Sequence, residues 1–153
     1  TLLAGVGTGF QQDLTGRENI RLQSSIYGRS KLETLELEDE VIEFSGIREF
    51  IDDPIRTYSA GMRARLGFAI ISSLDPEILL LDEVMSVGDH EFRKKSRARI
   101  EELVQGEATV VIVSHSKSIL NNLCSKVYAI DKGSVKTNGD IDEAFEFYES
   151  EKA

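Results

Sequence analysis

The chain has 153 residues, a formal net charge of −9 and an isoelectric point near 4.8. This acidic balance argues against nucleic acid as the main partner, because a phosphate backbone needs a basic surface, but it is compatible with a nucleotide held by a few local groups and Mg²⁺. Cys124 is the single cysteine, which excludes an internal disulfide and fits a reducing compartment such as the cytoplasm. No apolar run approaches the ~18–20 residues of a membrane span, and no signal peptide is visible, so a membrane role would need a partner.

The first residues, from Leu2 to Phe10, predict the end of a short strand followed by a glycine-rich turn. The chain starts at Thr1, without an initiator Met and in the middle of an apolar pattern, so we expect it to be part of a longer protein. Gly5, Gly7 and Gly9 could form a phosphate-binding loop, but Gly-Lys-Ser/Thr does not follow them. The sequence favours the alternative of a plain flexible turn.

Residues 15–58 predict a helical lobe of two to three helices, without convincing strands. Thr15 with Glu18, and Ser30 with Glu33, have the spacing of capping boxes, so a helix should follow each pair. The expected buried side of the first helix consists of Ile20, Leu22, Ile26 and Tyr27. The second helix, to about Phe44, carries the apolar residues Leu32, Leu35, Leu37, Val41, Ile42 and Phe44.

The second of these helices carries an acidic face. Between Lys31 and Arg48 there is no base, and the acids are Glu33, Glu36, Glu38, Asp39, Glu40 and Glu43. Such a run is ordinarily a solvated face, and the alternative is a docking face for a basic partner. A short helical turn should follow from Ile47 to Ile51 and stop before Pro54.

The rest of the chain alternates helices and strands. A helix should begin near Ser59 and end before Pro76, and the apolar run from Ile78 to Leu81 suits a strand buried on both faces. A helix from about 89 to 104, a second buried strand over 109–113, a short helix, a hairpin of strands 127–130 and 134–137, and a last helix over 141–148 should follow. This order predicts an α/β fold with a mostly parallel sheet flanked by helices, beside the helical lobe.

Polar side chains end both of the predicted buried strands. Asp82 and Glu83 end the first, and His115 ends the second. Because parallel strands place their carboxyl ends at one edge of a sheet, where ligands bind, we expect these side chains to meet. Asp82 is suited to hold Mg²⁺, Glu83 to accept a proton from an attacking water, and His115 to hydrogen-bond a terminal phosphate. The alternatives are a helix cap or solvated loop for the acid pair and a plain loop residue for His115.

A second candidate site lies at the start of the helix that precedes the acid-tipped strand. Ser59 stands at the expected N-cap with the small residues Ala60 and Gly61 beside it. Small residues allow a phosphate to approach bare N–H groups at the positive end of a helix. The order of this helix, the acids and His115 along the chain favours the functional interpretation of all three.

Four segments in this order resemble the motifs of ATP-binding-cassette (ABC) ATPases, which are P-loop NTPases. Residues 58–62 resemble the signature sequence, usually Leu-Ser-Gly-Gly-Gln, and residues 78–83 match the Walker B strand with its catalytic glutamate. Residues 86–89 resemble the D-loop, and His115 matches the switch histidine. The Tyr-Ser-x-Gly-Met form, with residues 14–20 upstream and residues 139–148 at the end, resembles the subgroup that exports polysaccharides such as O-antigen or teichoic acid.

The resemblance implies a role for each candidate residue. Glu83 and His115 would be catalytic, Asp82 would hold the metal, and nucleotide contacts would come from Ser59, Ala60, Gly61, Met62, Asp89 and the Q-loop candidate Gln11. It also implies a division into residues 1–14 with the Q-loop and the end of a core strand, residues 15–58 as the helical subdomain, and residues 59–153 with the signature helix and the core α/β part.

The sequence departs from the family pattern at three places. The Walker A loop, Gly-x-x-x-x-Gly-Lys-Ser/Thr, is absent, and in the family it lies upstream of the position of Thr1. Met62 replaces the usual signature glutamine and cannot make the same hydrogen bonds, and Gln11 lies closer to Leu14 than the usual Q-loop glutamine does. We therefore expect these 153 residues to be unable to hydrolyse ATP alone.

The resemblance also implies cofactors and partners. The cofactors are ATP and Mg²⁺, held between two cassettes that pair head to tail, most simply as a homodimer. The other partner is an integral membrane permease, which would place the protein at the cytoplasmic face of the membrane, and no nucleic acid is expected. Two alternatives stay open, a soluble ABC-type ATPase without a membrane partner and a non-enzymatic interaction module. A Gly-Lys-Ser/Thr loop encoded upstream of Thr1 would separate the enzyme from the module.

Overall fold

The computed structural model describes residues 2–4, 9–82, 89–106 and 108–151, with only the backbone of residues 2–4. The predicted roles of Glu83 and of the D-loop residues 86–88 therefore fall outside the described residues. The chain divides into two compact units, Thr1–Val111 and Ile112–Ala153, and each is described by itself.

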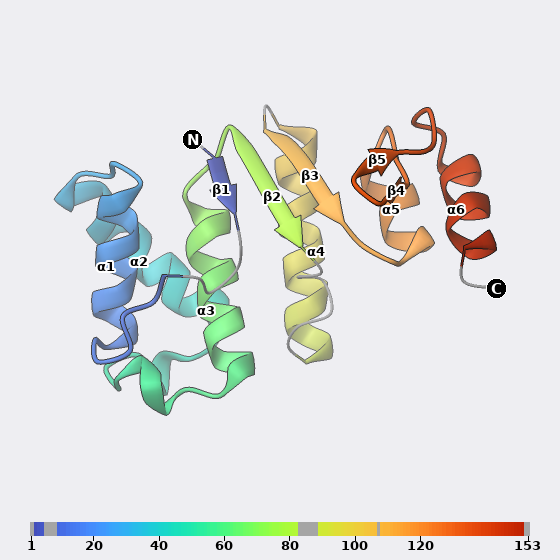
Figure 1. Cartoon of the computed structure of the whole chain (residues 1–153). Helices are drawn as coiled ribbons and strands as arrows, with labels where there is room; N and C mark the ends of the chain where they lie inside the picture. The colour runs from blue at the N-terminus through green and yellow to red at the C-terminus, as the bar shows by residue number, and fades with distance from the viewer. Residues whose placement is uncertain (1, 5–8, 83–88, 107, 152–153) are drawn as a thin grey trace. The chain divides into compact units, whose positions relative to one another are not determined.

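The helical part of the first unit contains α1 (Gly16–Ile26), α2 (Lys31–Ser45) and two short 3-10 helices, η1 (Arg48–Phe50) and η2 (Ile55–Thr57) (Figure 1). Both predicted capping boxes are present, one at the start of α1 and one at the start of α2. Gly46 ends α2 in the left-handed region with φ of 63°, a conformation that glycine adopts at little cost. The predicted helical turn after α2 is η1.

The buried face of α1 differs from the prediction. Ile26 is 64% exposed, although it was expected inside. The buried face of α1 contains Ile20, as predicted, and otherwise the polar or small residues Gly16, Asn19, Gln23 and Ser24. The side chains of Asn19 and Gln23 hydrogen-bond to neighbouring backbone groups, which offsets the cost of burying them.

The sheet of the first unit has the order β1–β2–β3, formed by β1 (Leu2–Ala4), β2 (Ile78–Asp82) and β3 (Thr109–Val113). β1 and β2 are parallel, with Leu3 opposite Leu79. The three arrows in Figure 1 run in the same direction, with α3 (Ala60–Ser73) and α4 (His90–Gln105) drawn behind them. This parallel arrangement agrees with the predicted α/β class.

The strands are less buried than expected. In β2, Leu79 and Leu81 are fully buried, but Ile78 is 40% exposed. In β3, Val111 is 48% exposed, so the prediction of burial on both faces is wrong for this chain. The side chains of β2 alternate between a buried and a more exposed face, which is the period-2 pattern of a sheet covered on one side.

Three aromatic rings join α2, α3 and α4. Phe44, Phe68 and Phe92 lie with ring centroids 5.8–6.0 Å apart, two of the pairs edge to face. Aromatic pairs in this geometry stabilise a core beyond their buried area. Through them the helical part and the helices beside the sheet share one core. Among the described residues, no helix combines the length and apolarity needed to cross a membrane.

The second unit contains α5 (Lys117–Leu123), the strands β4 (Ile130–Asp131) and β5 (Ser134–Val135), and α6 (Ile141–Ser150). β4 and β5 form an antiparallel hairpin in the predicted region, but its strands are shorter than the predicted ranges 127–130 and 134–137. Lys132 and Gly133 have φ of 49° and 76°, which is the conformation of a two-residue type I′ turn. The core of this unit consists of Leu120, Val127, Ala144 and Phe145.

Candidate functional site

Ser59 occupies the N-cap of α3, as predicted. Its backbone is extended and its Oγ accepts a hydrogen bond from the N–H of Met62 at 3.1 Å. Ser59 and Ala60 are exposed, Gly61 and Met62 are half-buried, and the first turn of α3 has no acid. A helix start of this kind offers free N–H groups and a positive dipole end to a phosphate.

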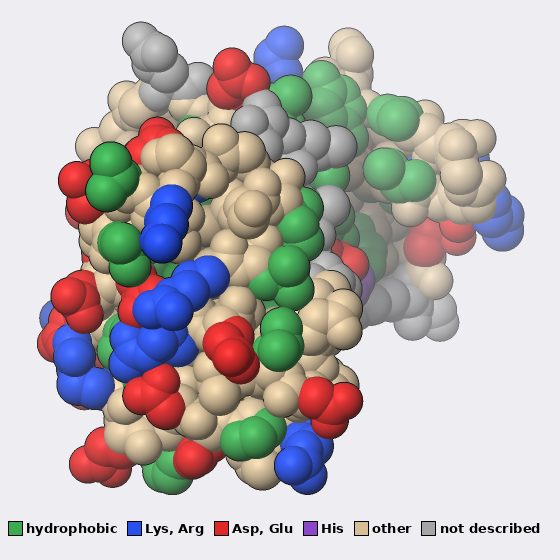
Figure 2. All heavy atoms as spheres, turned by 90° about the vertical axis from the view of Figure 1, so that its left-hand side faces the viewer, with side chains coloured by type: hydrophobic (Ala, Val, Ile, Leu, Met, Phe, Trp, Pro, Cys, Tyr) green, Lys and Arg blue, Asp and Glu red, His purple; other side chains and the backbone are tan. Residues whose placement is uncertain are grey.

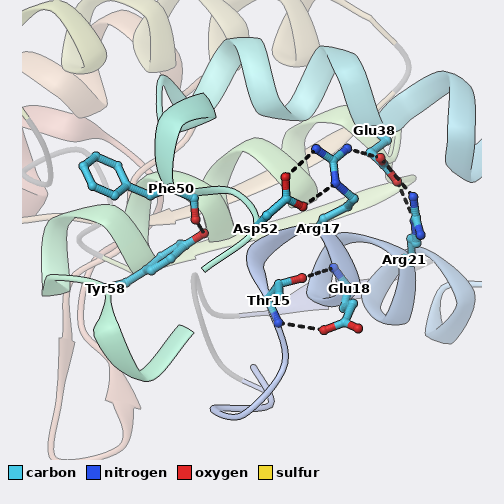
Figure 3. Close-up of polar contacts among 8 residues, drawn as sticks. All are labelled: Thr15, Arg17, Glu18, Arg21, Glu38, Phe50, Asp52 and Tyr58. Carbon is cyan, nitrogen blue, oxygen red and sulfur yellow. Dashed lines mark hydrogen bonds and ion pairs between the residues drawn. The ribbon is translucent and has the colours of Figure 1, made fainter. Parts of the chain in front are cut away.

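Tyr58, directly before the cap, fixes the position of this helix start. Its side chain is buried, and its hydroxyl donates to the carbonyl of Phe50 at 2.6 Å (Figure 3). Burial raises the pKa of Tyr58 to about 12, because the phenolate would be desolvated, and nearby Asp53 and Asp52 add to this shift. Its hydroxyl oxygen, together with Ile51, leaves no room for a β-carbon at Gly16, which explains a glycine as the first residue of α1.

A network of charges connects α1, α2 and the segment after η1. Arg17 forms a bidentate pair with Asp52, with Nε–Oδ1 and Nη2–Oδ2 distances of 2.7 and 3.1 Å, and also pairs with Glu38 (Figure 3). Arg21 Nε binds the second oxygen of Glu38 at 2.7 Å. Burial opposes the ionisation of Glu38, but the hydrogen bonds from Arg21 and Arg17 outweigh it and lower its pKa. The expected solvated acidic face of α2 is therefore wrong for Glu38.

The surface around these helices mixes charges. Figure 2 looks onto this side of the first unit and shows Lys and Arg side chains gathered among acidic ones, with hydrophobic side chains between them. Glu33 and Glu43 of α2 lie 3.5 and 3.4 Å from Arg29 and Arg48, so neighbouring bases partly neutralise the acidic face.

The Q-loop candidate Gln11 is held by its backbone. Its N–H donates to Oδ1 of Asn19 at 2.8 Å, and its carbonyl accepts from Nδ2 of Asn19 at 3.1 Å, while its side chain is exposed. Gln23 reaches the same segment, since its Nε2 donates to the carbonyl of Gly9 at 3.1 Å. Neither Asn19 nor Gln23 was a site candidate from the sequence, although their spacing on the Ile20 side of α1 was a usable signal.

Asp82 is exposed at the carboxyl end of β2, and its predicted role as a metal ligand stays a prediction. Its neighbour Glu83 lies outside the described residues. Across the described ranges, no three His, Cys, Asp or Glu side chains come together as a metal site. A single exposed carboxylate fits Mg²⁺, which proteins hold through one or two carboxylates while water and phosphate supply the other ligands.

Asp89 is the N-cap of α4, and its carboxylate accepts a hydrogen bond from the N–H of Phe92 at 2.8 Å. This hydrogen bond lowers the pKa of Asp89, and Arg65, 3.6 Å away, adds to the effect. The pair connects α3 to the start of α4. The structure therefore gives Asp89 a capping function, and the predicted nucleotide contact stays a prediction.

His115 belongs to the second unit, where its Nδ1 lies 2.8 Å from the hydroxyl of Tyr148. The two rings are stacked with centroids 5.4 Å apart and planes inclined by 15°. Because Asp82 belongs to the first unit, the expected approach of His115 to Asp82 also stays a prediction.

Comparison with known proteins points to one family. Residues 4–86 match the family described as ABC transporter. The chain is 40% identical over 148 residues to the O-antigen export system ATP-binding protein RfbB of Klebsiella pneumoniae, which covers 97% of this chain and 60% of that protein. It is 39% identical to the teichoic acids export ATP-binding protein TagH of Shouchella clausii (strain KSM-K16), over 97% of this chain and 41% of the relative.

The fold also has a solved counterpart. A structure titled "Structure of ATP binding subunit of ABC transporter" superposes with a TM-score of 0.79 over 99% of this chain and 63% of the other, at 19% identity. At this identity the likeness concerns the fold alone, and it agrees with the predicted α/β class.

Proposed function

The chain belongs to the ABC transporter family, and we propose that the protein is the ATP-binding subunit of a transporter that exports a cell-surface polysaccharide. The observation that carries this proposal is the 40% identity to an O-antigen export ATP-binding protein over 97% of the chain. The similarity to a teichoic acid export protein supports the same class of cargo. The chain spans about 60% of the length of the first of these relatives, so its activity and partners are inferred for the whole protein.

The start of α3 would bind nucleotide in this proposal. The exposed start of α3, with Ser59, Ala60, Gly61 and Met62, would bind the phosphates of a nucleotide held by a second copy. Met62 would contribute its backbone, because its thioether cannot replace the hydrogen bonds of a glutamine side chain.

The sheet edge would act on the nucleotide of its own copy. Asp82 would hold Mg²⁺, which neutralises phosphate charge when bound, and Glu83 would accept the proton of the attacking water. His115 would hydrogen-bond the terminal phosphate, with Gln11 and Asp89 at the margins of the site.

The proposed partners are a second cassette, most simply another copy, and an integral membrane permease. Energy released in hydrolysis would separate the two cassettes and move the permease. The protein would then work at the cytoplasmic face of the membrane, attached through the permease. The mixed surface of α1 and α2 is the proposed contact with basic cytoplasmic loops of that permease, which carry an excess of Lys and Arg.

Ser59→Asp tests the role of the α3 start. Aspartate is as good an N-cap as serine, so the stability of α3 should be kept, but its negative charge would repel a phosphate. We expect the full-length protein to lose ATP hydrolysis by about 10-fold or more, which is about 1.4 kcal/mol in the barrier, while its thermal unfolding midpoint stays unchanged.

Ser30→Asp is the matched control, because Ser30 caps α2 in the same geometry. It should leave hydrolysis unchanged; because its new charge lies beside Glu33, it serves as a control for hydrolysis and not for stability. Hydrolysis at the wild-type rate in Ser59→Asp would refute the nucleotide-binding role of this helix start.

A further inference from the structure

In the second unit, His115, which we propose to hydrogen-bond the terminal phosphate, contacts the last helix, α6. The hydroxyl of Tyr148, on α6, lies 2.8 Å from Nδ1 of His115, and the two rings stack with a centroid distance of 5.4 Å. Phe145 packs edge to face against the ring of Tyr148, at a centroid distance of 6.1 Å. The phenol is therefore held on two sides, by the imidazole and by a core residue.

The helix that carries Tyr148 is itself fixed. Ala144 and Phe145 are buried in the core of the second unit, and Asp140 caps the start of α6. Lys117, two residues after His115, forms an ion pair with Asp142 at 2.7 Å and lies 5.7 Å from the ring centre of Phe145. Together with the Tyr148 contact, these interactions hold the segment of His115 against α6.

The chemistry of imidazole gives this contact a consequence. A neutral imidazole carries one proton, and the hydrogen bond made by one ring nitrogen decides which nitrogen keeps it. If the phenol donates to Nδ1, the proton must lie on Nε2, and Nε2 becomes a donor. A phosphate oxygen accepts hydrogen bonds and has no proton to give a lone pair on Nε2, so only this tautomer suits His115 for binding a terminal phosphate.

We propose that Tyr148 is a positioning residue for His115, donating its hydroxyl proton to Nδ1 and so holding the imidazole as the tautomer protonated on Nε2. The catalytic consequence rests on the proposed function, whereas the tautomer is a property of the chain alone. Stacking restrains the ring plane and the hydrogen bond restrains its rotation, so that Nε2 keeps one direction. Such a hydrogen bond orients the imidazole of His115 toward the phosphate, and it contributes less to the affinity for the nucleotide.

The first test measures the tautomer of His115 by nitrogen-15 NMR in the isolated chain. The chain has two histidines, so His90→Gln assigns the signals. In alkaline buffer, we expect Nδ1 of His115 to resonate as an unprotonated nitrogen and Nε2 as a protonated one. Tyr148→Phe keeps the stacked ring and should raise the fraction of His115 that is protonated on Nδ1.

Tyr128→Phe is the matched control, since it removes a hydroxyl from an exposed tyrosine of the same unit and should leave the tautomer unchanged. A wild-type His115 protonated on Nδ1, or a tautomer ratio that Tyr148→Phe does not alter, would overturn the proposal. Unfolding midpoints of both variants show whether the second unit is intact.

The second test follows catalysis in the full-length protein. Loss of one orienting hydrogen bond, worth about 0.5–1.5 kcal/mol, should lower kcat about 2- to 10-fold in Tyr148→Phe with KM for ATP unchanged. An unchanged kcat, with His115→Ala inactive, would overturn the positioning role. An active His115→Ala would instead refute the function proposed for His115, and the NMR result would still decide whether Tyr148 sets its tautomer.

Discussion

At the scale of single residues, Glu38 is the acid whose environment departs most from the sequence pattern. Its side chain is 8% exposed and shared by Arg17 and Arg21. Replacement by glutamine removes the charge and leaves both arginines with weaker partners. We expect Glu38→Gln to lower the free energy of unfolding by about 1–3 kcal/mol, less than for a fully buried pair because both arginines also contact water. Urea unfolding measures this loss.

Glu36→Gln provides the matched control, because Glu36 is exposed on the same helix. It should change stability by less than about 0.5 kcal/mol. Equal losses in the two variants would show that the network around Glu38 contributes nothing beyond a surface charge.

The lowered pKa of Glu38 predicts that the free energy of unfolding depends on pH. Arginine hydrogen bonds lower the pKa of Glu38 below its ordinary 4.5, against the effect of burial, so the unfolded chain takes up a proton at higher pH than the folded chain. The stabilisation is therefore complete above about pH 5 and is lost as pH falls through the pKa of the folded state. The stability difference between wild type and Glu38→Gln should narrow below pH 4.5 in urea unfolding series. A difference that stays constant down to pH 3 would contradict this assignment.

At the scale of elements, the N-caps of the helices were predicted more accurately than the buried face of α1. Thr15, Ser30 and Ser59 each begin a helix where local sequence placed them, because a cap is decided by hydrogen bonds within four residues. The buried face of α1 depends instead on what packs against it. Gly16 is buried because Tyr58 lies against it, more than 40 positions later in the sequence, and apolar content alone placed Ile26 inside incorrectly.

A substitution at Asn19 tests whether α1 holds the segment around the Q-loop candidate Gln11 in place. Its buried side chain accepts from Gln11 and donates to three carbonyls, those of Gln11, Leu14 and Thr15. We expect Asn19→Ala to cost about 2–3 kcal/mol, because buried backbone groups lose their partners, and to speed hydrogen exchange at the amide of Gln11. Asn122→Ala, the same change at an exposed position, should do neither. Unchanged exchange at Gln11 would show that this segment is held by other contacts.

At the scale of the whole molecule, the order of motifs predicted the family and the α/β class, and the structure adds the contacts that no short motif contains. Tyr148 was noticed in the sequence only as part of a closing pattern, and its contact with His115, 33 residues earlier, requires the fold of the second unit. For β2 and β3 the predictions failed in burial rather than in position, because the alternation of exposure along a strand depends on what covers each face of the sheet.

Measuring the affinity of these 153 residues for ATP shows how much the α3 start contributes to ATP binding in the absence of a phosphate loop. The sequence holds no Gly-x-x-x-x-Gly-Lys-Ser/Thr segment, whose backbone N–H groups and lysine make most phosphate contacts in P-loop enzymes. The start of α3 would face the nucleotide of a second copy, so it adds little without that copy. We therefore expect the isolated chain to bind ATP with a Kd of about 1 mM or weaker, no more than about 4 kcal/mol. Titration calorimetry with Mg²⁺ measures it, and micromolar binding would mean that the described residues contain a phosphate site other than the proposed one.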